Sequence, residues 1–130
     1  MTYGYTKEVG EDFEKAIRTL KEKLAEEGFG VLFEIDVQET LKKKMDVDFD
    51  QYVILGACNP PLAHRALVAE KEMGLLLPCN IVVYEKDGKV FVSAIVPTVA
   101  MQGLDNDTVR EIATEAEAKL KSAIDALPAA

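Results

Sequence analysis

An Asp-Gly pair between two apolar runs is the feature that most limits the fold of this chain. Asp87-Gly88 separates residues 81–84 from residues 90–96, and both runs are rich in β-branched side chains. A two-residue Asp-Gly loop favours the primed turns whose twist matches that of paired strands. The sequence therefore predicts a β-hairpin here, which argues against a purely parallel sheet.

The rest of the chain alternates between strand and helix patterns. Apolar side chains alternate in the strand segments and form a stripe at helical spacing in the helical ones. Strand patterns cover residues 2–9, 29–35 and 52–55, and helical patterns cover residues 11–27, 36–45, 60–71 and 105–127. We further expect residues 75–78 to form a buried connector and residues 128–130 a frayed tail.

These patterns predict one α+β domain spanning residues 1–130. The expected order is β-α-β-α-β-α-β-β-α, in a mixed, largely antiparallel sheet of about five strands packed with helices.

Both faces of the predicted hairpin are apolar, and this bears on assembly. Val90, Val92 and Ala94 fall on one face, whereas Phe91 and Ile95 fall on the other. Helices of the chain can cover one face, and the second face needs more helix or a second copy of the chain. Since twofold pairing is the commonest soluble assembly, we expect a homodimer.

The charge and the apolar runs exclude some classes of partner. The formal net charge is −8, and no stripe of Lys and Arg interleaved with aromatic residues is present, so we expect no nucleic-acid partner. No run approaches the roughly 20 apolar residues that span a bilayer, so no membrane partner is expected. The first residues lack the pattern of a signal peptide, and we expect a cytoplasmic protein whose thiols stay reduced.

Two short strings carry most of the chemical character of the sequence. Residues 58–64 read Cys-Asn-Pro-Pro-Leu-Ala-His, and residues 77–80 read Leu-Pro-Cys-Asn. Together they contain both cysteines and the only histidine. If their strands are antiparallel, the two thiols lie at the same end of the sheet; if parallel, they lie about 17–20 Å apart. The candidate ligand-binding site consists of Cys58, Asn59, His64, Cys79 and Asn80.

Each of these residues also has a purely structural interpretation. Asn59 is a good helix N-cap, and proline is tolerated at the first helical position that follows. Free cysteines are often simply buried, His64 fits the border of a helix, and the scattered methionines fit core or edge packing.

The pattern is compatible with three functions, and enzymatic activity is left open. The first is a ligand-binding or sensing module with a Cys/Asn/His pocket. The second is a thiol-dependent enzyme or redox protein, in which Cys58 is the nucleophile, His64 its base and Cys79 the resolving thiol. The third is a structural or interaction domain with core cysteines. Zinc or copper(I) would suit Cys58, His64 and Cys79. A fourth ligand would have to come from Asp36, Glu70 or elsewhere, so no metal site is assigned.

The motif order resembles the family known as domain of unknown function 302. The resemblance rests on the strand ending Gly56-Ala57-Cys58-Asn59-Pro60, the Leu77-Pro78 step, the Asp87-Gly88-Lys89-Val90 hairpin and the preceding Phe33-Glu34-Ile35-Asp36. It covers residues 29–96 and implies a compact α+β fold in small prokaryotic proteins, with no established activity. Many relatives have a simple Gly-Asn-Pro turn without these cysteines, so the resemblance implies no thiol chemistry for the family at large.

Overall fold

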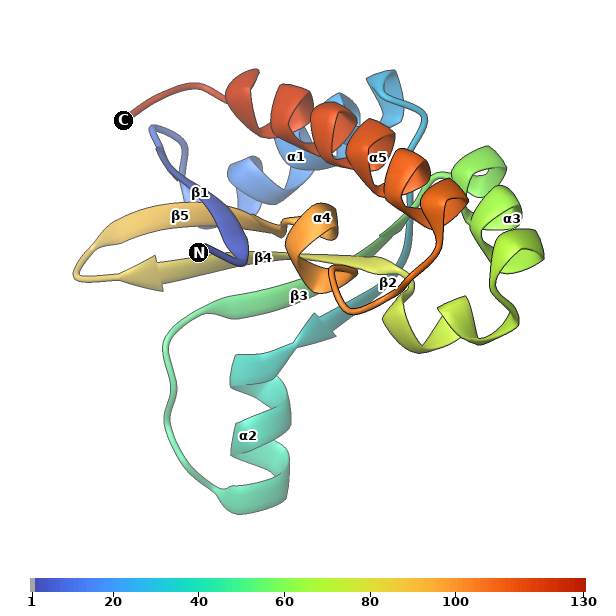
Figure 1. Ribbon diagram of the computed structural model, residues 1–130. Coiled ribbons are helices and arrows are strands. Elements are labelled where there is room, and N and C mark those ends of the chain that lie inside the picture. The colour runs from blue at the N-terminus through green and yellow to red at the C-terminus, as the bar shows by residue number, and fades with distance from the viewer. Residues whose placement is uncertain (1) are drawn as a thin grey trace.

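A computed structural model describes residues 2–130 and shows a single five-stranded sheet with helices on one side (Figure 1). The sheet order is β1-β5-β4-β3-β2, and every neighbouring pair is antiparallel. The predicted α+β class and the alternation of elements are confirmed. The strands are β1 (Gly4–Val9), β2 (Gly30–Asp36), β3 (Tyr52–Cys58), β4 (Cys79–Lys86) and β5 (Lys89–Ile95).

The helices include two short ones that the sequence patterns did not indicate, η1 and α4. The helices are α1 (Phe13–Glu26), α2 (Val37–Met45), α3 (Pro60–Ala69), the 3-10 helix η1 (Lys71–Leu76), α4 (Pro97–Ala100) and α5 (Asp107–Asp125).

The segment predicted as a buried connector is different in the structure. Its first half, Leu75 and Leu76, belongs to η1, and the side chain of Leu75 is 83% exposed. The preceding helix, α3, ends at Ala69 rather than at residue 71, because Glu70 adopts an extended conformation with φ of −147°. This break redirects the chain into η1 and leaves Met73 as its buried residue.

The β4–β5 hairpin forms as the Asp-Gly pair predicts. Asp87 and Gly88 both have positive φ, at 53° and 76°. These are the angles that a primed two-residue turn requires. The turn fixes Lys86 opposite Lys89 and sets the register of the two interior strands β4 and β5.

Two clusters of buried apolar side chains make up the core. The larger cluster lies between the sheet and the helices α1 and α5, and includes Leu20, Leu55, Ile81 and Ile124. The smaller cluster lies beyond the end of the sheet, where α3, η1 and α4 pack against α5. The chain therefore continues its core past the strand ends.

Within residues 2–130, no helix packs across the other face of the sheet, and α2 contacts mainly β2 and β3 near one edge (Figure 1). We call it the open face. The segment 37–51, consisting of α2 and the loop that follows it, projects away from the body beside this face, and we call it the arm. Helix α2 contains no buried residue, so the rest of the chain covers this helix only in part.

The C-terminal tail is held in place rather than frayed. Ala129 forms a β-bridge with Val9, and the backbone N–H of Gly10 donates to the carbonyl of Pro128 at 2.9 Å. The ammonium of Lys7 also donates to the carbonyl of Asp125 at 3.0 Å. These bonds attach the tail to β1. No helix within residues 2–130 is both long and apolar enough to cross a membrane.

Candidate functional site

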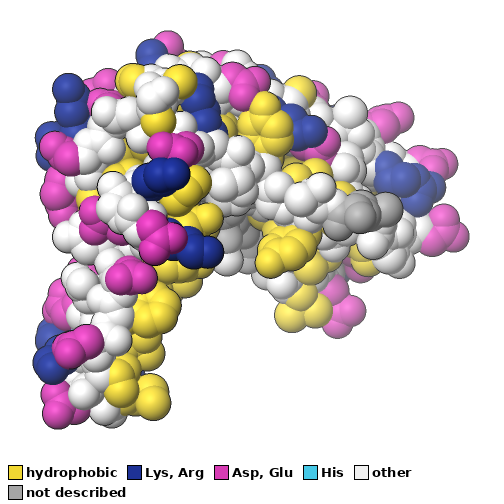
Figure 2. Space-filling view, turned by 90° about the vertical axis from the view of Figure 1, so that its left-hand side faces the viewer, with side chains coloured by type: hydrophobic (Ala, Val, Ile, Leu, Met, Phe, Trp, Pro, Cys, Tyr) yellow, Lys and Arg dark blue, Asp and Glu magenta, His cyan; other side chains and the backbone are white. Residues whose placement is uncertain are grey.

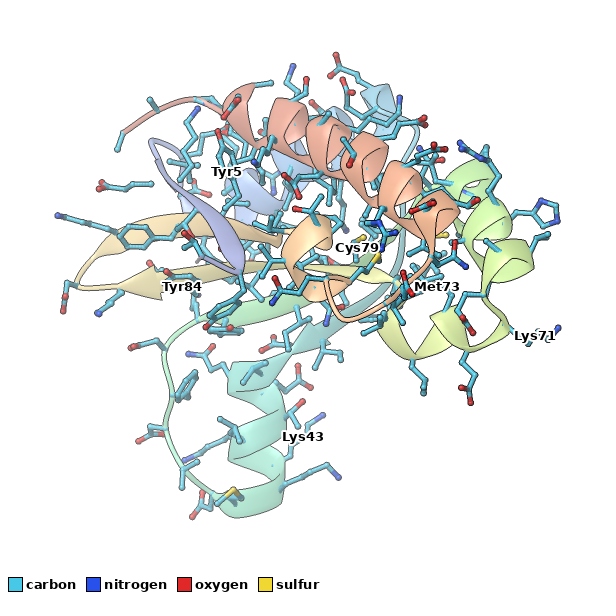
Figure 3. The ribbon with its side chains drawn as sticks, in the orientation of Figure 1. Tyr5, Lys43, Lys71, Met73, Cys79 and Tyr84 are labelled. Atoms are coloured by element: carbon cyan, nitrogen blue, oxygen red, sulfur yellow. The ribbon has the colours of Figure 1, made fainter. Side chains whose placement is uncertain are left out.

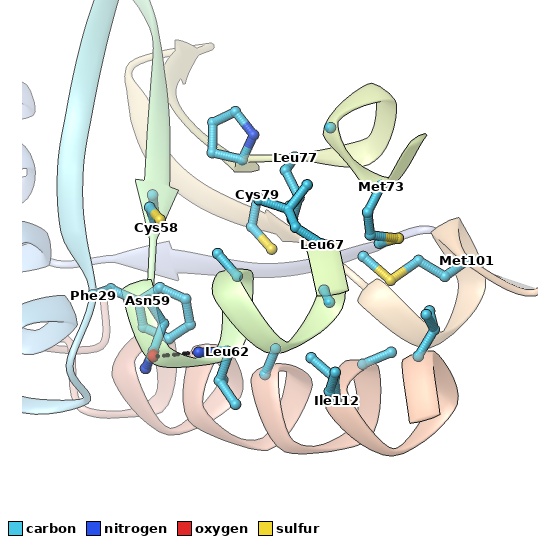
Figure 4. Close-up of a pocket in the computed structure, with 18 of the residues that line it drawn as sticks. Phe29, Cys58, Asn59, Leu62, Leu67, Met73, Leu77, Cys79, Met101 and Ile112 are labelled. Carbon is cyan, nitrogen blue, oxygen red and sulfur yellow. Dashed lines mark hydrogen bonds between the residues drawn. The ribbon is translucent and has the colours of Figure 1, made fainter. Parts of the chain in front are cut away.

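A cavity of about 250 Å³ lies where the two core clusters meet. Its walls come from the end of β3, the start of β4, and the helices α3, η1 and α5 (Figure 4). Almost all of the side chains that line it are apolar. The polar exceptions are Asn59 and the two cysteine thiols.

Antiparallel pairing of β3 with β4 brings the two cysteines to this cavity. Ala57 is the register partner of Cys79, so Cys58 and Cys79 are diagonal neighbours at one end of the sheet. Of the two strand arrangements considered from the sequence, the structure has the antiparallel one, with both thiols at the same end of the sheet. Both cysteines are free and line the cavity wall.

The two thiols differ in their surroundings. Cys79 is 7% exposed and belongs to the main core, whereas Cys58 is half-buried. Burial, with a smaller contribution from the nearby Cys58, raises the pKa of the Cys79 thiol to about 11. Cys79 is therefore a neutral thiol at neutral pH, because an apolar environment disfavours the thiolate.

Asn59 uses its whole side chain to shape the cavity entrance. Its Oδ1 accepts from the backbone N–H of Leu62 at 3.3 Å, which caps α3. Its Nδ2 donates to the carbonyl of Glu27 at 3.3 Å, which ties α3 to the end of α1. Since both ends of the amide have protein partners, the one amide side chain of the wall is already satisfied.

The remaining predicted site residues lie elsewhere. His64 is exposed on α3, in a separate shallow depression with Arg65, Val68 and Thr108. His64 lies two positions after Leu62, whose side chain points into the core. Side chains two positions apart on a helix do not face the same side. Asn80 is exposed on the open face, opposite Gly56. The fold thus gathers Cys58, Asn59 and Cys79 and separates them from His64 and Asn80.

Comparison with known proteins places this arrangement in a family. The model of the family described as "Domain of unknown function DUF302" matches residues 5–127. The chain belongs to the DUF302 family. No curated protein matches it. A solved structure that resembles it is the crystal structure of an uncharacterized conserved DUF302 protein from Bacillus stearothermophilus, with a TM-score of 0.91 and 35% sequence identity, covering 96% of this chain and 98% of that one. The family relation therefore extends well beyond the central motifs.

Several cavity residues of this DUF302 protein had no functional signal in the sequence. Met73 comes from η1, Met101 ends α4, and Ile112 lies on α5. Figure 4 shows the two methionines on the same side of the cavity, away from Cys58. Because these elements are far apart in the chain, only the packing of α3 and α4 against α5, with η1 against α3, brings them together. The apolar stripe of α5 was visible in the sequence, but its partner was not.

The chemistry available to the DUF302 cavity is limited. Within residues 2–130, no group of three or more His, Cys, Asp or Glu side chains could hold a metal ion. No charged side chain lines the cavity. The walls thus offer dispersion contacts, two thiols and two thioether sulfurs, which suit a small and largely apolar molecule.

Proposed function

We propose that this DUF302 protein is a ligand-binding or sensing module that binds a small apolar molecule in the cavity beside Cys58 and Cys79. The observation that carries the proposal is the cavity wall itself, which is apolar apart from two thiols and one amide that already has partners. Ligand sites in proteins are commonly concave and apolar with few polar groups. An apolar cavity gains from an apolar occupant, because the wall atoms recover dispersion contacts.

The size of the cavity limits the ligand. An engineered apolar cavity of about 150 Å³ stays dry and binds benzene or xenon. The cavity here is larger, at about 250 Å³, but below the roughly 300–1,000 Å³ of drug-sized sites. The proposed ligand class is therefore a single substituted ring, a compact bicyclic molecule or a short branched hydrocarbon chain.

The thiol environments support binding rather than thiol catalysis. A catalytic cysteine needs a lowered pKa or an adjacent base. Cys79 has a raised pKa of about 11, and His64 lines a different depression from Cys58. In the proposed function the sulfurs of Cys58, Cys79, Met73 and Met101 act as soft, polarisable wall atoms.

We also propose that the protein acts as a homodimer in the cytoplasm. The open face supports the homodimer, because large apolar side chains such as Phe33 and Ile35 stay exposed there. The two free cysteines support the location, because thiols stay reduced in the cytoplasm.

The methionines provide a direct test of the proposed ligand site. With ¹³C-labelled methionine methyl groups, benzene, toluene and indole are titrated into the native protein. Met73 and Met101 line the cavity, whereas Met45 lies on the arm and is 66% exposed. We expect saturable shifts of the Met73 and Met101 methyl signals and a constant Met45 signal. Equal shifts of all three, or none, would reject the proposal.

A pair of variants on one helix controls for general effects. Ala113 faces the cavity from α5, and Ala118 is exposed on the same helix. Ala113→Leu adds volume inside the cavity and should weaken probe binding about tenfold or more. Ala118→Leu should leave binding unchanged. Circular dichroism melts check that both variants fold. Because overpacking of a core costs about 1–3 kcal/mol, Ala113→Leu is compared at a temperature well below its melting transition.

A further inference from the structure

The open face has the composition of a protein interface. The side chains on this side of the central strands are mostly aromatic or aliphatic, and Tyr52, Tyr84 and Phe91 form a continuous stack across three strands, with ring centroids 5.7 and 5.3 Å apart. Charged side chains reach this face only at its border, at Glu8, Lys86 and Lys89. An aromatic centre with a charged rim is characteristic of binding surfaces.

Most of the large apolar side chains left exposed in residues 2–130 gather around this face. They lie on the open face, at its border or on the arm, and are Tyr3, Phe33, Ile35, Met45, Val47, Phe49, Leu75 and Leu76. Tyr3 shares a depression with the aromatic stack, and Leu75 and Leu76 share another with Phe33. A contiguous apolar surface of this extent marks an interaction site.

The arm presents a second uncovered surface next to the first. Its helix, α2, has only nine residues and no buried side chain. Isolated helices of this length are marginal in water and depend on packing of an apolar side. Figure 2 shows hydrophobic side chains along the edge of the arm that borders the space beneath the body. Lys43 projects into solvent (Figure 3), where it pairs with Glu39 at 2.6 Å.

We propose that two copies of this chain dimerise by exchanging arms, each arm packing its apolar side on the open face of the other copy. This inference deepens the homodimer of the proposed function by naming its interface. The body and the arm together form an L-shaped outline with a notch between them (Figures 1 and 2). A twofold axis through the notch places each arm in the notch of its partner. Such an interface is self-complementary and closed, so it ends at two copies.

A second copy of the chain covers the open face and the apolar side of the arm at the same time. A stable interface buries about 800 Å² per partner, about a tenth of the surface of a small protein. The accessible surface of the chain is 7548 Å², and arm exchange covers the sheet face and the apolar side of the arm together. The charges of the arm do not oppose this contact, because Lys42 pairs with Asp46 and Asp48, and Lys43 pairs with Glu39, within the arm itself.

Three single substitutions test this arrangement by sedimentation velocity over a range of protein concentrations. Met45→Glu alters the arm and Tyr84→Glu alters the open face. Val68→Glu is the control for Met45→Glu, because Val68 is 75% exposed on α3, outside the proposed interface, and Met45 is 66% exposed. We expect the wild-type protein to be a dimer at micromolar concentration. The first two substitutions should raise the dimer dissociation constant about tenfold or more, and Val68→Glu should not change it. A wild-type monomer, or an equal effect of Val68→Glu, would overturn the proposal.

Mixing the variants tests the exchange itself. In a mixture of Met45→Glu and Tyr84→Glu chains, one intact arm can still meet one intact face. The mixture should therefore contain more dimer than either variant alone at the same total concentration. A sample of the double variant should contain no more dimer than either single variant. If the mixture dimerises no better than its components, arm exchange is wrong. Probe binding, measured on the same samples through the methyl signals of Met73 and Met101, reports separately on the cavity.

Discussion

Cys58 and Cys79 line one cavity, yet they lie on opposite faces of the two strands that carry them. Ala57, not Cys58, is the register partner of Cys79, and successive side chains of a strand point to opposite faces. A disulfide requires Cβ vectors that point toward each other, with a separation of about 3.5–4.5 Å. The two thiols are therefore neighbours that the strand geometry keeps from pairing.

The first prediction concerns the order in which the thiols react. In native protein near pH 7.5, an alkylating reagent should label the half-buried Cys58 and leave Cys79 unlabelled until the protein unfolds. Mass spectrometry of peptides identifies the labelled site, and Cys58→Ala should abolish the native-state labelling. Faster labelling of Cys79 than of Cys58 would contradict the observed burial.

The second prediction is a loss of stability at alkaline pH. The pKa of the Cys79 thiol is about 11 in the folded protein, against an ordinary value of 9.0 for cysteine. The folded state therefore keeps this proton when the unfolded state releases it. The contribution of the protonated Cys79 thiol to the free energy of unfolding is fully present below about pH 9. It is lost as the pH rises through about 11, and the loss amounts to about 2–3 kcal/mol in all.

Urea unfolding at several pH values measures this effect against matched variants. The stability of Cys79→Ala should fall less steeply between pH 9 and 11 than that of the wild type. Cys58→Ala should retain most of the wild-type slope, because Cys58 makes only the smaller contribution to the raised pKa of Cys79. Lysine and tyrosine titrations are common to all three proteins, so the difference between slopes isolates Cys79. Identical slopes for wild type and Cys79→Ala would show that burial does not raise the pKa of the Cys79 thiol.

The third prediction concerns the cap that holds α3 over the cavity. Asn59→Ala removes the acceptor for Leu62 N–H and the donor to the carbonyl of Glu27, and should cost about 1–2 kcal/mol of unfolding free energy. Asn59→Asp keeps the acceptor and should cost less. The exposed Asn80→Ala serves as the control and should stay within about 0.5 kcal/mol of wild type. If Asn59→Ala were as stable as Asn80→Ala, the cap would have no structural role.

Local patterns were sufficient to predict most of the architecture from the sequence. The Asp87-Gly88 turn predicted the β4–β5 hairpin, and Asn59 with Pro60 predicted the start of α3. These features depend on a few adjacent residues, whose backbone preferences are the same in any fold. The sequence patterns failed where a tertiary contact decides the structure. The hydrophobicity of residues 75–78 indicated burial, whereas the 3-10 turn exposes Leu75 at the border of the open face.

The candidate site was predicted only in part, for a related reason. Cys58, Asn59 and Cys79 flank strands that pair directly, so their proximity follows once the pairing is antiparallel. The position of His64 depends on the rotation of α3 about its axis, which is set by Leu62 and Ala66 packing against α5. Met73 and Met101 reach the cavity through two short helices without a pattern of their own. The apolar character of the site became evident only with the structure.

The most direct measurement is diffraction from crystals held under xenon pressure. Xenon enters dry apolar cavities, including an engineered one of about 150 Å³, and is located by its anomalous scattering. The proposed function predicts a xenon atom in the cavity between Met73, Met101 and Ile112, and none there in crystals of Ala113→Leu. Ordered water in place of xenon, or a cavity closed by its own side chains, would contradict the proposal that this site binds an apolar ligand.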